Sequence, residues 1–298
     1  MSQRMELAYP LELFRQNFDR HVAFLKECTA DQVPLYYTCS SGERERYFKP
    51  AVTLDQAAEL FRGQVRTIRD SGLRIDVIYA GGGIGATILD RPEQQEEYRH
   101  ICRVASEQQI KIIGLGLPNP PRASTDATWF DTLVRNYQWM SDVAAASGLK
   151  LASHCGTDCG RRFCTIADLE EWLTRVNRDN NGLTFCFGNI ALAGEDVPAA
   201  IRRLARWIFS VHVRQTAGTF GKTGEERPLH SGEIDLRYCL KVLSEIGYTG
   251  ILHPEHFPRF ATALAPEPRD LWYLAGEPDG PTLAWTLGYL RGLINAVG

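Results

Sequence analysis

Short apolar runs alternate with longer amphipathic segments along the whole chain, and this alternation constrains the fold more than any other feature. Runs rich in β-branched and aromatic residues predict eight strands, at Met5–Tyr9, Leu35–Cys39, Arg74–Tyr79, Lys111–Gly116, Lys150–His154, Leu183–Phe187, Ile208–Val213 and Gly250–Pro254. Strands that alternate with helices form parallel sheets, and eight such units favour a closed (β/α)8 TIM barrel over an open sheet.

Helical periodicity fills the segments between these strands. It predicts helices at Leu11–Glu27, Leu54–Asp70, Pro92–Gln108, Phe130–Ala146, Ile166–Asn177, Val197–Ala205, Leu236–Ile246 and about Pro281–Ala296. We therefore predict an α/β fold with a single TIM-barrel domain over residues 1–298. The long loops Arg214–His230 and Phe257–Asp279 follow strands 7 and 8 of this barrel, so we expect both to overhang its mouth.

Composition narrows the class of protein. The net charge of −3, without a cluster of basic residues, argues against binding to nucleic acid. No apolar stretch approaches the roughly 20 residues that span a bilayer, which argues against a membrane partner. The first ten residues lack the pattern of a signal peptide, so we expect a cytoplasmic protein with reduced cysteines.

Two sequence motifs are better explained as loop structure than as binding sites. The glycine-rich stretch Ala80–Ala86 contains G-x-G-x-x-A but runs into a loop rather than a helix, so we interpret it as a flexible loop and not a nucleotide site. Cys155, Cys159 and Cys164 cluster, but their spacing does not match the usual zinc patterns. We expect them to be free thiols in a loop.

Metal-type side chains recur at the ends of predicted strands in the C-terminal half, residues 150–298. They are His154, Cys186, His212 and Glu255. Their intervals of 32, 26 and 43 residues scatter around one strand-plus-helix unit, which averages roughly 31 residues in a barrel of about 250. If each run is a barrel strand, these side chains converge at the C-terminal mouth, where barrel enzymes carry out their chemistry.

The types of side chain indicate the chemistry. Imidazole and carboxylate suit manganese, iron or zinc, and a thiolate favours zinc or iron. His256 directly follows Glu255 and could act as a general acid or base near neutral pH. Arg214 lies two residues after His212, where a guanidinium beside a metal would bind a substrate carboxylate. An exposed arginine at the start of a loop is equally compatible with this spacing.

The C-terminal half resembles mannonate dehydratase, a family of xylose-isomerase-like TIM barrels. The resembling stretches are FCFGNIALAGED, FSVHVRQ, PLHSGEIDLRYCLKVLSEIGYTG, HPEHFPRF and TLGYLRGLINAV, in the family's order over about residues 150–298. The combination of two motifs is specific within the superfamily. The first is Val-His-x-Arg after a strand-end cysteine, and the second is His-x-Gly-[Asp/Glu]-x-Asp before a helix. The N-terminal half matches only as a succession of βα units.

The resemblance implies a Mn²⁺ or Fe²⁺ site, with Zn²⁺ also compatible, whose ligands are His154, Cys186, His212 and Glu255. It further implies that His256 is catalytic, that Arg214 binds substrate and that His230 belongs to a substrate-binding mouth loop. The family's catalytic tyrosine falls on Glu277–Gly280, which contains none, and nearby Tyr273 is the candidate to replace it.

The implied function is a hydro-lyase that removes water from a sugar acid and yields a 2-keto-3-deoxy sugar acid. The first alternative is a metal-dependent sugar isomerase or epimerase of the same superfamily, with Asp158 and Glu255 as its paired carboxylates. The second is a sugar-acid-binding homologue that has lost the chemistry. Trp272, Tyr273 and Trp285 are compatible with a contact in a homo-oligomer and equally with burial.

Overall fold

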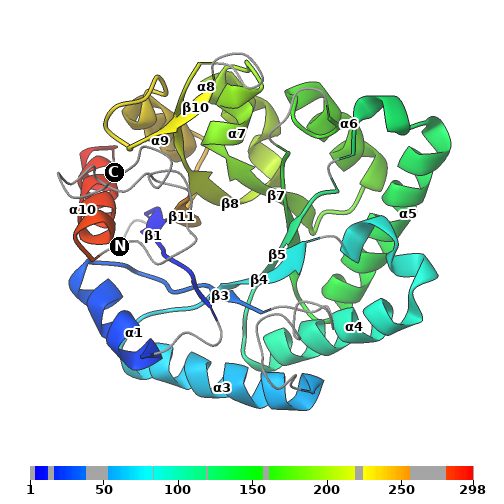
Figure 1. Cartoon of the computed structure of the whole chain (residues 1–298), viewed down its shortest axis with the longest axis horizontal. Helices are drawn as coiled ribbons and strands as arrows, with labels where there is room; N and C mark the ends of the chain where they lie inside the picture. Colours follow the sequence, from blue (N-terminus) through cyan, green and yellow to red (C-terminus); the bar gives the residue numbers. More distant parts are fainter. Residues whose placement is uncertain are drawn as a thin grey trace, which may run out of the picture.

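The computed structural model describes residues 4–12, 17–37, 53–82, 84–118, 120–156, 161–218, 224–255 and 280–297. Within these ranges, one 9-stranded sheet has the order β1-β11-β8-β7-β6-β5-β4-β3-β2, and all its neighbours are parallel. Its strands are β1 (Glu6–Leu7), β2 (Leu11–Glu12), β3 (Leu35–Tyr36), β4 (Val77–Gly82), β5 (Ile112–Gly116), β6 (Lys150–His154), β7 (Asn181–Cys186), β8 (Ile208–Val213) and β11 (Ile251–Pro254). The sheet curls into a barrel surrounded by helices (Figure 1).

The segment that carries β1 and β2 closes the barrel. β1 is paired with β11, and the N–H of Ala8 donates to the carbonyl oxygen of Leu252 at 3.0 Å. β2 is paired with β3 on the other side, where the N–H of Leu11 donates to the carbonyl oxygen of Pro34 at 2.9 Å. The two short strands therefore share one of eight positions in the ring, and the predicted (β/α)8 barrel is confirmed.

The strands follow the apolar runs because barrel strands are covered on both faces. All six residues of β7 are buried, which explains a run without polar alternation. β6 and β8 have the bounds predicted from the sequence. β1 and β3 are shorter than predicted, at two residues each.

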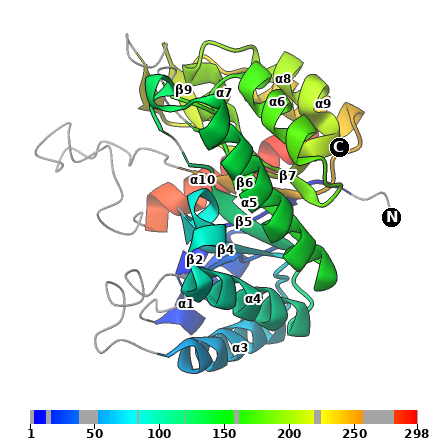
Figure 2. The same ribbon diagram turned by 90° about the vertical axis from the view of Figure 1, so that its right-hand side faces the viewer.

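The described helices are α1 (Phe18–Glu27), α3 (Leu54–Asp70), α4 (Pro92–Glu107), α5 (Ala127–Ala146), α6 (Ile166–Val176), α7 (Phe187–Leu192), α8 (Val197–Leu204), α9 (Leu236–Glu245) and α10 (Gly280–Val297), with short 3-10 turns η1 (Ile84–Ala86), η2 (Ile88–Asp90), η3 (Arg122–Ser124) and η4 (Ala205–Trp207). Thr53 and Gln56 form a capping box at the start of α3. Gly72 and Gly148, with φ of 83° and 70°, provide the left-handed turns after α3 and α5. Figure 2 shows α3, α4 and α5 in succession along one side of the barrel.

Apart from strand lengths, the structure differs from the sequence-based expectation at several points. The glycine-rich stretch that was interpreted as a flexible loop continues β4 as far as Gly82 and then forms the 3-10 turn η1. The first helix begins at Phe18 and not at Leu11, because residues 11–12 extend the ladder as β2. A short helix, α7, follows β7 directly. The loop after β8 contains a hairpin of β9 (Gln215–Ala217) and β10 (Glu225–Arg227). The predicted loop Phe257–Asp279 lies outside the described residues.

Two apolar clusters hold the layers together. The larger cluster packs the outward side chains of the strands against the helices, with Trp172 fully buried among them. The smaller cluster consists of Ala8, Val77, Tyr79 and Ile251. Because Tyr79 also reaches side chains on the non-adjacent strands β8 and β11, this cluster lies in the barrel interior. Among the described helices, none is both long and apolar enough to span a bilayer.

Candidate metal centre

Neighbouring strands bring the predicted ligands to one edge of the sheet. β6 ends at His154, β7 ends at Cys186, and Cys186 is paired in register with His212 of β8. Glu255 directly follows β11, and its backbone N–H donates to the carbonyl oxygen of Val213 at 3.1 Å. Since the strands are parallel, all four side chains lie at the carboxyl end of the barrel, where TIM-barrel enzymes have their active sites.

One carboxylate oxygen is the centre of this cluster. The Oε2 atom of Glu255 lies 3.4 Å from Nε2 of His154 and 3.2 Å from Nδ1 of His212. The Sγ atom of Cys186 donates to the same oxygen at 3.5 Å. Potential ligand atoms of His154, His212 and Glu255 all lie within 4.8 Å of one another. Side chains from four different strands or strand ends therefore face one small volume.

The electrostatics of the cluster follow from burial and from the paired charges. Burial alone would raise the pKa of Glu255, but the two histidines hold it well below its usual value. Burial would lower the pKa of His154, yet the charge of Glu255 and hydrogen bonds with Cys186 and Glu255 raise it to about 10. Burial and the nearby carboxylate both raise the pKa of the Cys186 thiol. Without a metal, His154 and Cys186 therefore hold protons on the atoms that would bind it.

These residues fit a divalent transition metal. Two imidazole nitrogens and a carboxylate oxygen are a common donor set for manganese, iron and zinc, and a thiolate at the same point adds a softer ligand. The anionic carboxylate would offset part of the cost of burying a dication. The identity of the ion, and the assignment of His154, Cys186, His212 and Glu255 as its ligands, stay predictions.

Tyr79 and His253, which were not among the predicted ligands, lie behind the cluster. The hydroxyl of Tyr79 is 3.1 Å from Nε2 of His212 and 3.2 Å from Nδ1 of His253. His212 and His253 are paired in register, and their ring centroids are 4.4 Å apart. The spacing His253-x-Glu255 could have indicated this, because residues two apart in a strand share a face.

Arg214 is engaged by protein side chains. Its Nη1 atom donates to Oδ1 of Asn189 at 2.7 Å, and its Nη2 atom forms an ion pair with Glu226 of β10. The side chain is 8% exposed, so it is not the exposed loop arginine that the spacing also allowed. Gly188 makes room for it, because a Cβ there would lie 2.7 Å from Cδ of Arg214.

The remaining predicted residues have different outcomes. His230 is exposed, and its ring packs edge-on against Trp285 of α10, with centroids 4.8 Å apart. His256 and Tyr273 lie outside the described residues, so their roles stay predictions. Among the described cysteines of the predicted loop, Cys155 and Cys164 are buried, and the Cys164 thiol donates to the carbonyl oxygen of Arg161 at 3.3 Å.

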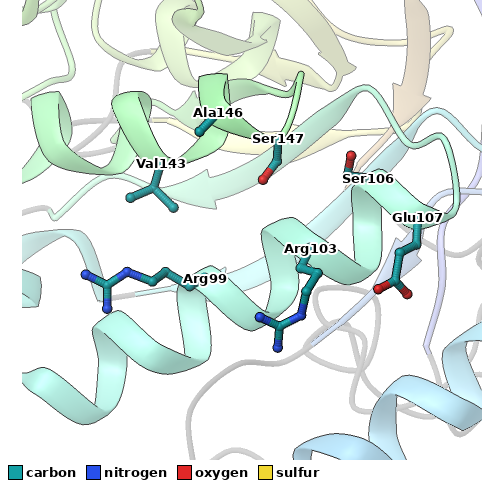
Figure 3. Close-up of a pocket in the computed structure, with 7 residues that line it drawn as sticks. All are labelled: Arg99, Arg103, Ser106, Glu107, Val143, Ala146 and Ser147. Atoms are coloured by element: carbon teal, nitrogen blue, oxygen red, sulfur yellow. The ribbon is translucent and has the colours of Figure 1, made fainter.

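A depression lies on the outer surface between α4 and α5 (Figure 3). Figure 3 shows the side chains that line it, which are Arg99, Arg103, Ser106, Glu107, Val143, Ala146 and Ser147. None of them belongs to the cluster at the strand ends. We therefore place the candidate site at the barrel mouth.

Comparison with known proteins gives the same assignment of fold and family. The model of the family described as Xylose isomerase-like TIM barrel matches residues 14–273. Mannonate dehydratase of Enterococcus faecalis is 33% identical over 94 residues, which is 30% of this chain and 26% of that protein. Mannonate dehydratase of Brucella canis is 29% identical over 190 residues, 59% of this chain and 46% of that protein. The matches thus span less than half the length of either relative.

Solved structures show the same fold at lower identity. Mannonate dehydratase from Streptococcus suis serotype 2 superimposes with a TM-score of 0.71 and 16% identity, covering 99% of this chain and 94% of that one. D-psicose 3-epimerase superimposes with a TM-score of 0.69 and 14% identity, covering 99% of this chain and 100% of that one. A dehydratase and an epimerase are therefore about equally similar in structure.

Proposed function

Because this chain belongs to the family of xylose isomerase-like TIM barrels, we propose that it is a metal-dependent hydro-lyase that acts on a sugar acid. The observation that carries the proposal is the convergence of His154, His212 and Cys186 on the carboxylate of Glu255 at the barrel mouth. The sequence similarity to mannonate dehydratases supports dehydration as the reaction. The product would be a 2-keto-3-deoxy sugar acid.

The proposed reaction needs a base, an acid and a way to stabilise charge beside the carboxylate. A bound Mn²⁺ or Fe²⁺ would polarise the substrate carboxylate and so acidify the proton on C2. A base removes this proton, the C3 hydroxyl leaves as water after it is protonated, and the enol product becomes the 2-keto acid. We assign the proton transfers to His256, which directly follows the proposed ligand Glu255, with Tyr273 as the candidate second group.

The test is product formation by the metal-loaded protein. We expect release of a 2-keto-3-deoxy acid from mannonate or from another hexonate or pentonate. His256→Ala should abolish the activity, whereas His21→Ala, on the outer helix α1, should retain it. If the loaded protein releases no 2-keto acid from any of these substrates, the lyase proposal is wrong.

One observation favours a second candidate, a sugar isomerase or epimerase. The charge of Arg214 is already neutralised by Glu226, which is a poor arrangement for binding a substrate carboxylate and a better one for a neutral sugar. Such an enzyme would move a proton at carbon without loss of water. Incorporation of solvent deuterium into a recovered ketose, with no keto acid formed, would identify this activity.

A further inference from the structure

A hydrogen-bonded triad crosses the barrel interior directly beneath the candidate metal centre. The hydroxyl of Tyr79 on β4 lies 3.1 Å from His212 on β8 and 3.2 Å from His253 on β11. All three side chains are buried, with 7%, 4% and 3% exposure respectively. The proposed reaction uses neither Tyr79 nor His253, so these two residues have no role assigned so far.

The surroundings of Tyr79 fix the position of its ring. Gly114 is paired with Tyr79 in β5, and a Cβ at Gly114 would lie 2.4 Å from Cδ1 of the ring. Tyr36, paired on the other side in β3, packs against the ring with centroids 5.1 Å apart. The Tyr36 ring on one side and the space left by Gly114 on the other hold the Tyr79 hydroxyl between the two histidines.

The number of protons allows only two arrangements of a neutral triad. A phenol has one proton to donate, and a neutral imidazole carries its proton on one nitrogen. Tyr79 can therefore donate to only one histidine, and the other histidine must donate to Tyr79. In one arrangement, Nε2 of His212 donates to Tyr79, which donates to Nδ1 of His253. In the other arrangement, Nδ1 of His253 donates to Tyr79, which donates to Nε2 of His212.

A metal selects between these arrangements. Nδ1 of His212 is the nitrogen that faces Glu255, at 3.2 Å, so it is the one that would bind a metal. Ligation requires a lone pair on Nδ1, which places the proton of a neutral ring on Nε2. Nε2 then donates to Tyr79, and the hydroxyl proton of Tyr79 must point to His253.

We propose that Tyr79 is a positioning residue that holds His212 as an Nδ1 metal ligand and couples the tautomer of His212 to that of His253. This proposal rests on the proposed metal centre. Hydrogen-bond partners behind a histidine ligand orient the ring and raise its basicity, and their loss typically weakens metal binding by about 10- to 100-fold.

The first experiment measures the affinity for Zn²⁺, used as a spectroscopically silent probe, by competition with a chelator. Tyr79→Phe keeps the ring and removes the hydroxyl, and we expect affinity to fall by about 10- to 100-fold. The matched control is Tyr98→Phe, which removes a buried hydroxyl that donates to the carbonyl oxygen of Met140, between the outer helices α4 and α5. This control should bind Zn²⁺ as the wild type does.

The second experiment needs no variant. Long-range ¹⁵N–¹H spectra of the Zn²⁺-loaded wild type report which nitrogen of each histidine carries the proton. We expect both His212 and His253 to be protonated on Nε2. A proton on Nδ1 of His253, or wild-type affinity in Tyr79→Phe, would overturn the proposal. If the wild type itself binds no metal, the proposed metal centre fails and the positioning role fails with it. Weaker Zn²⁺ binding by Tyr79→Phe than by the wild type supports both.

Discussion

The Arg214 guanidinium forms a buried ion pair with Glu226, and the two side chains are only 8% and 12% exposed. Arg214 lies two residues beyond His212, and Glu226 lies in β10, the second strand of the hairpin that follows β8. A carboxylate of the protein thus pairs with the guanidinium that we propose as the binding group for a substrate carboxylate. The availability of Arg214 therefore distinguishes the two candidate functions, because a sugar-acid lyase needs a cation for the substrate carboxylate and an enzyme for neutral sugars does not.

Glu226→Gln should increase affinity for sugar acids if Arg214 can reach the substrate. The amide keeps the shape and removes the competing charge, so a substrate carboxylate can form the charge-assisted hydrogen bond, worth about 1.5–3 kcal/mol. We expect mannonate to bind about 10- to 100-fold more tightly, as measured by calorimetry. Neutral mannose should be unaffected. Glu225→Gln is the matched control, since Glu225 pairs with Arg227 on the exposed side of the hairpin. Equal mannonate affinity in both variants would mean that Arg214 does not contact the substrate.

Removal of single predicted ligands should abolish stoichiometric metal binding. His212→Ala removes a donor atom that lies 3.2 Å from the central carboxylate oxygen, and Cys186→Ala removes the thiol 3.5 Å from it. We expect elemental analysis to find about one equivalent of Mn or Fe in the wild type and little in either variant. Cys239→Ala, at a buried position on α9, is the control for loss of a buried thiol and should retain the metal. A full equivalent in Cys186→Ala would remove Cys186 from the ligand set.

Metal affinity should rise with pH. In the metal-free protein the pKa of His154 is about 10 and that of Cys186 is raised, so both groups hold protons at neutral pH. A metal must displace these protons, and affinity should therefore increase by roughly tenfold per pH unit for each proton released, up to about pH 9. Calorimetry in two buffers with different ionisation enthalpies counts the released protons. Affinity that is constant between about pH 6 and 9 would contradict this coupling.

Asp168 should be important for stability without affecting metal binding. Its buried carboxylate forms ion pairs with Arg122 and Arg162, and Arg122 is 38% exposed. Asp168→Asn removes the carboxylate that pairs with both arginines, although Arg162 keeps an ion pair with Glu171. We expect a loss of about 2–3 kcal/mol, less than for a fully buried pair because solvent screens Arg122. Urea unfolding gives the change in free energy. Asp142→Asn, which breaks the surface pair with Arg178, should cost less than about 1 kcal/mol.

The parts of the fold that were predictable are those where burial alone dictates the residue pattern. Lys150–His154 and Ile208–Val213 are strands with the predicted bounds, because a parallel barrel strand is covered on both faces and reads as one apolar run. Helix α7 has no such signature, since it follows β7 without a turn and nearly all its residues are buried. The β9–β10 hairpin is stabilised by its own pairing and not by an apolar pattern.

The candidate site was predictable only in part. Strand ends and residue types indicated His154, Cys186, His212 and Glu255, because parallel strands deliver their carboxyl ends to one edge. The roles of Tyr79 and Glu226 depend on contacts between strands that are not neighbours and on the turn of a hairpin. Such contacts are set by the curvature of the barrel, which periodicity along one strand does not encode.

The closure of the barrel has a consequence for biosynthesis. β1 near the N-terminus pairs with β11, the strand that precedes Glu255, so this ladder joins segments separated by most of the chain. Pairings of such long sequence separation form slowly, and a chain emerging from the ribosome holds an unpaired strand edge until its last strand is made. The proposed metal site, which needs Glu255 after β11, can therefore form only once every strand of this sheet has been synthesised, so metal loading would follow closure of the barrel.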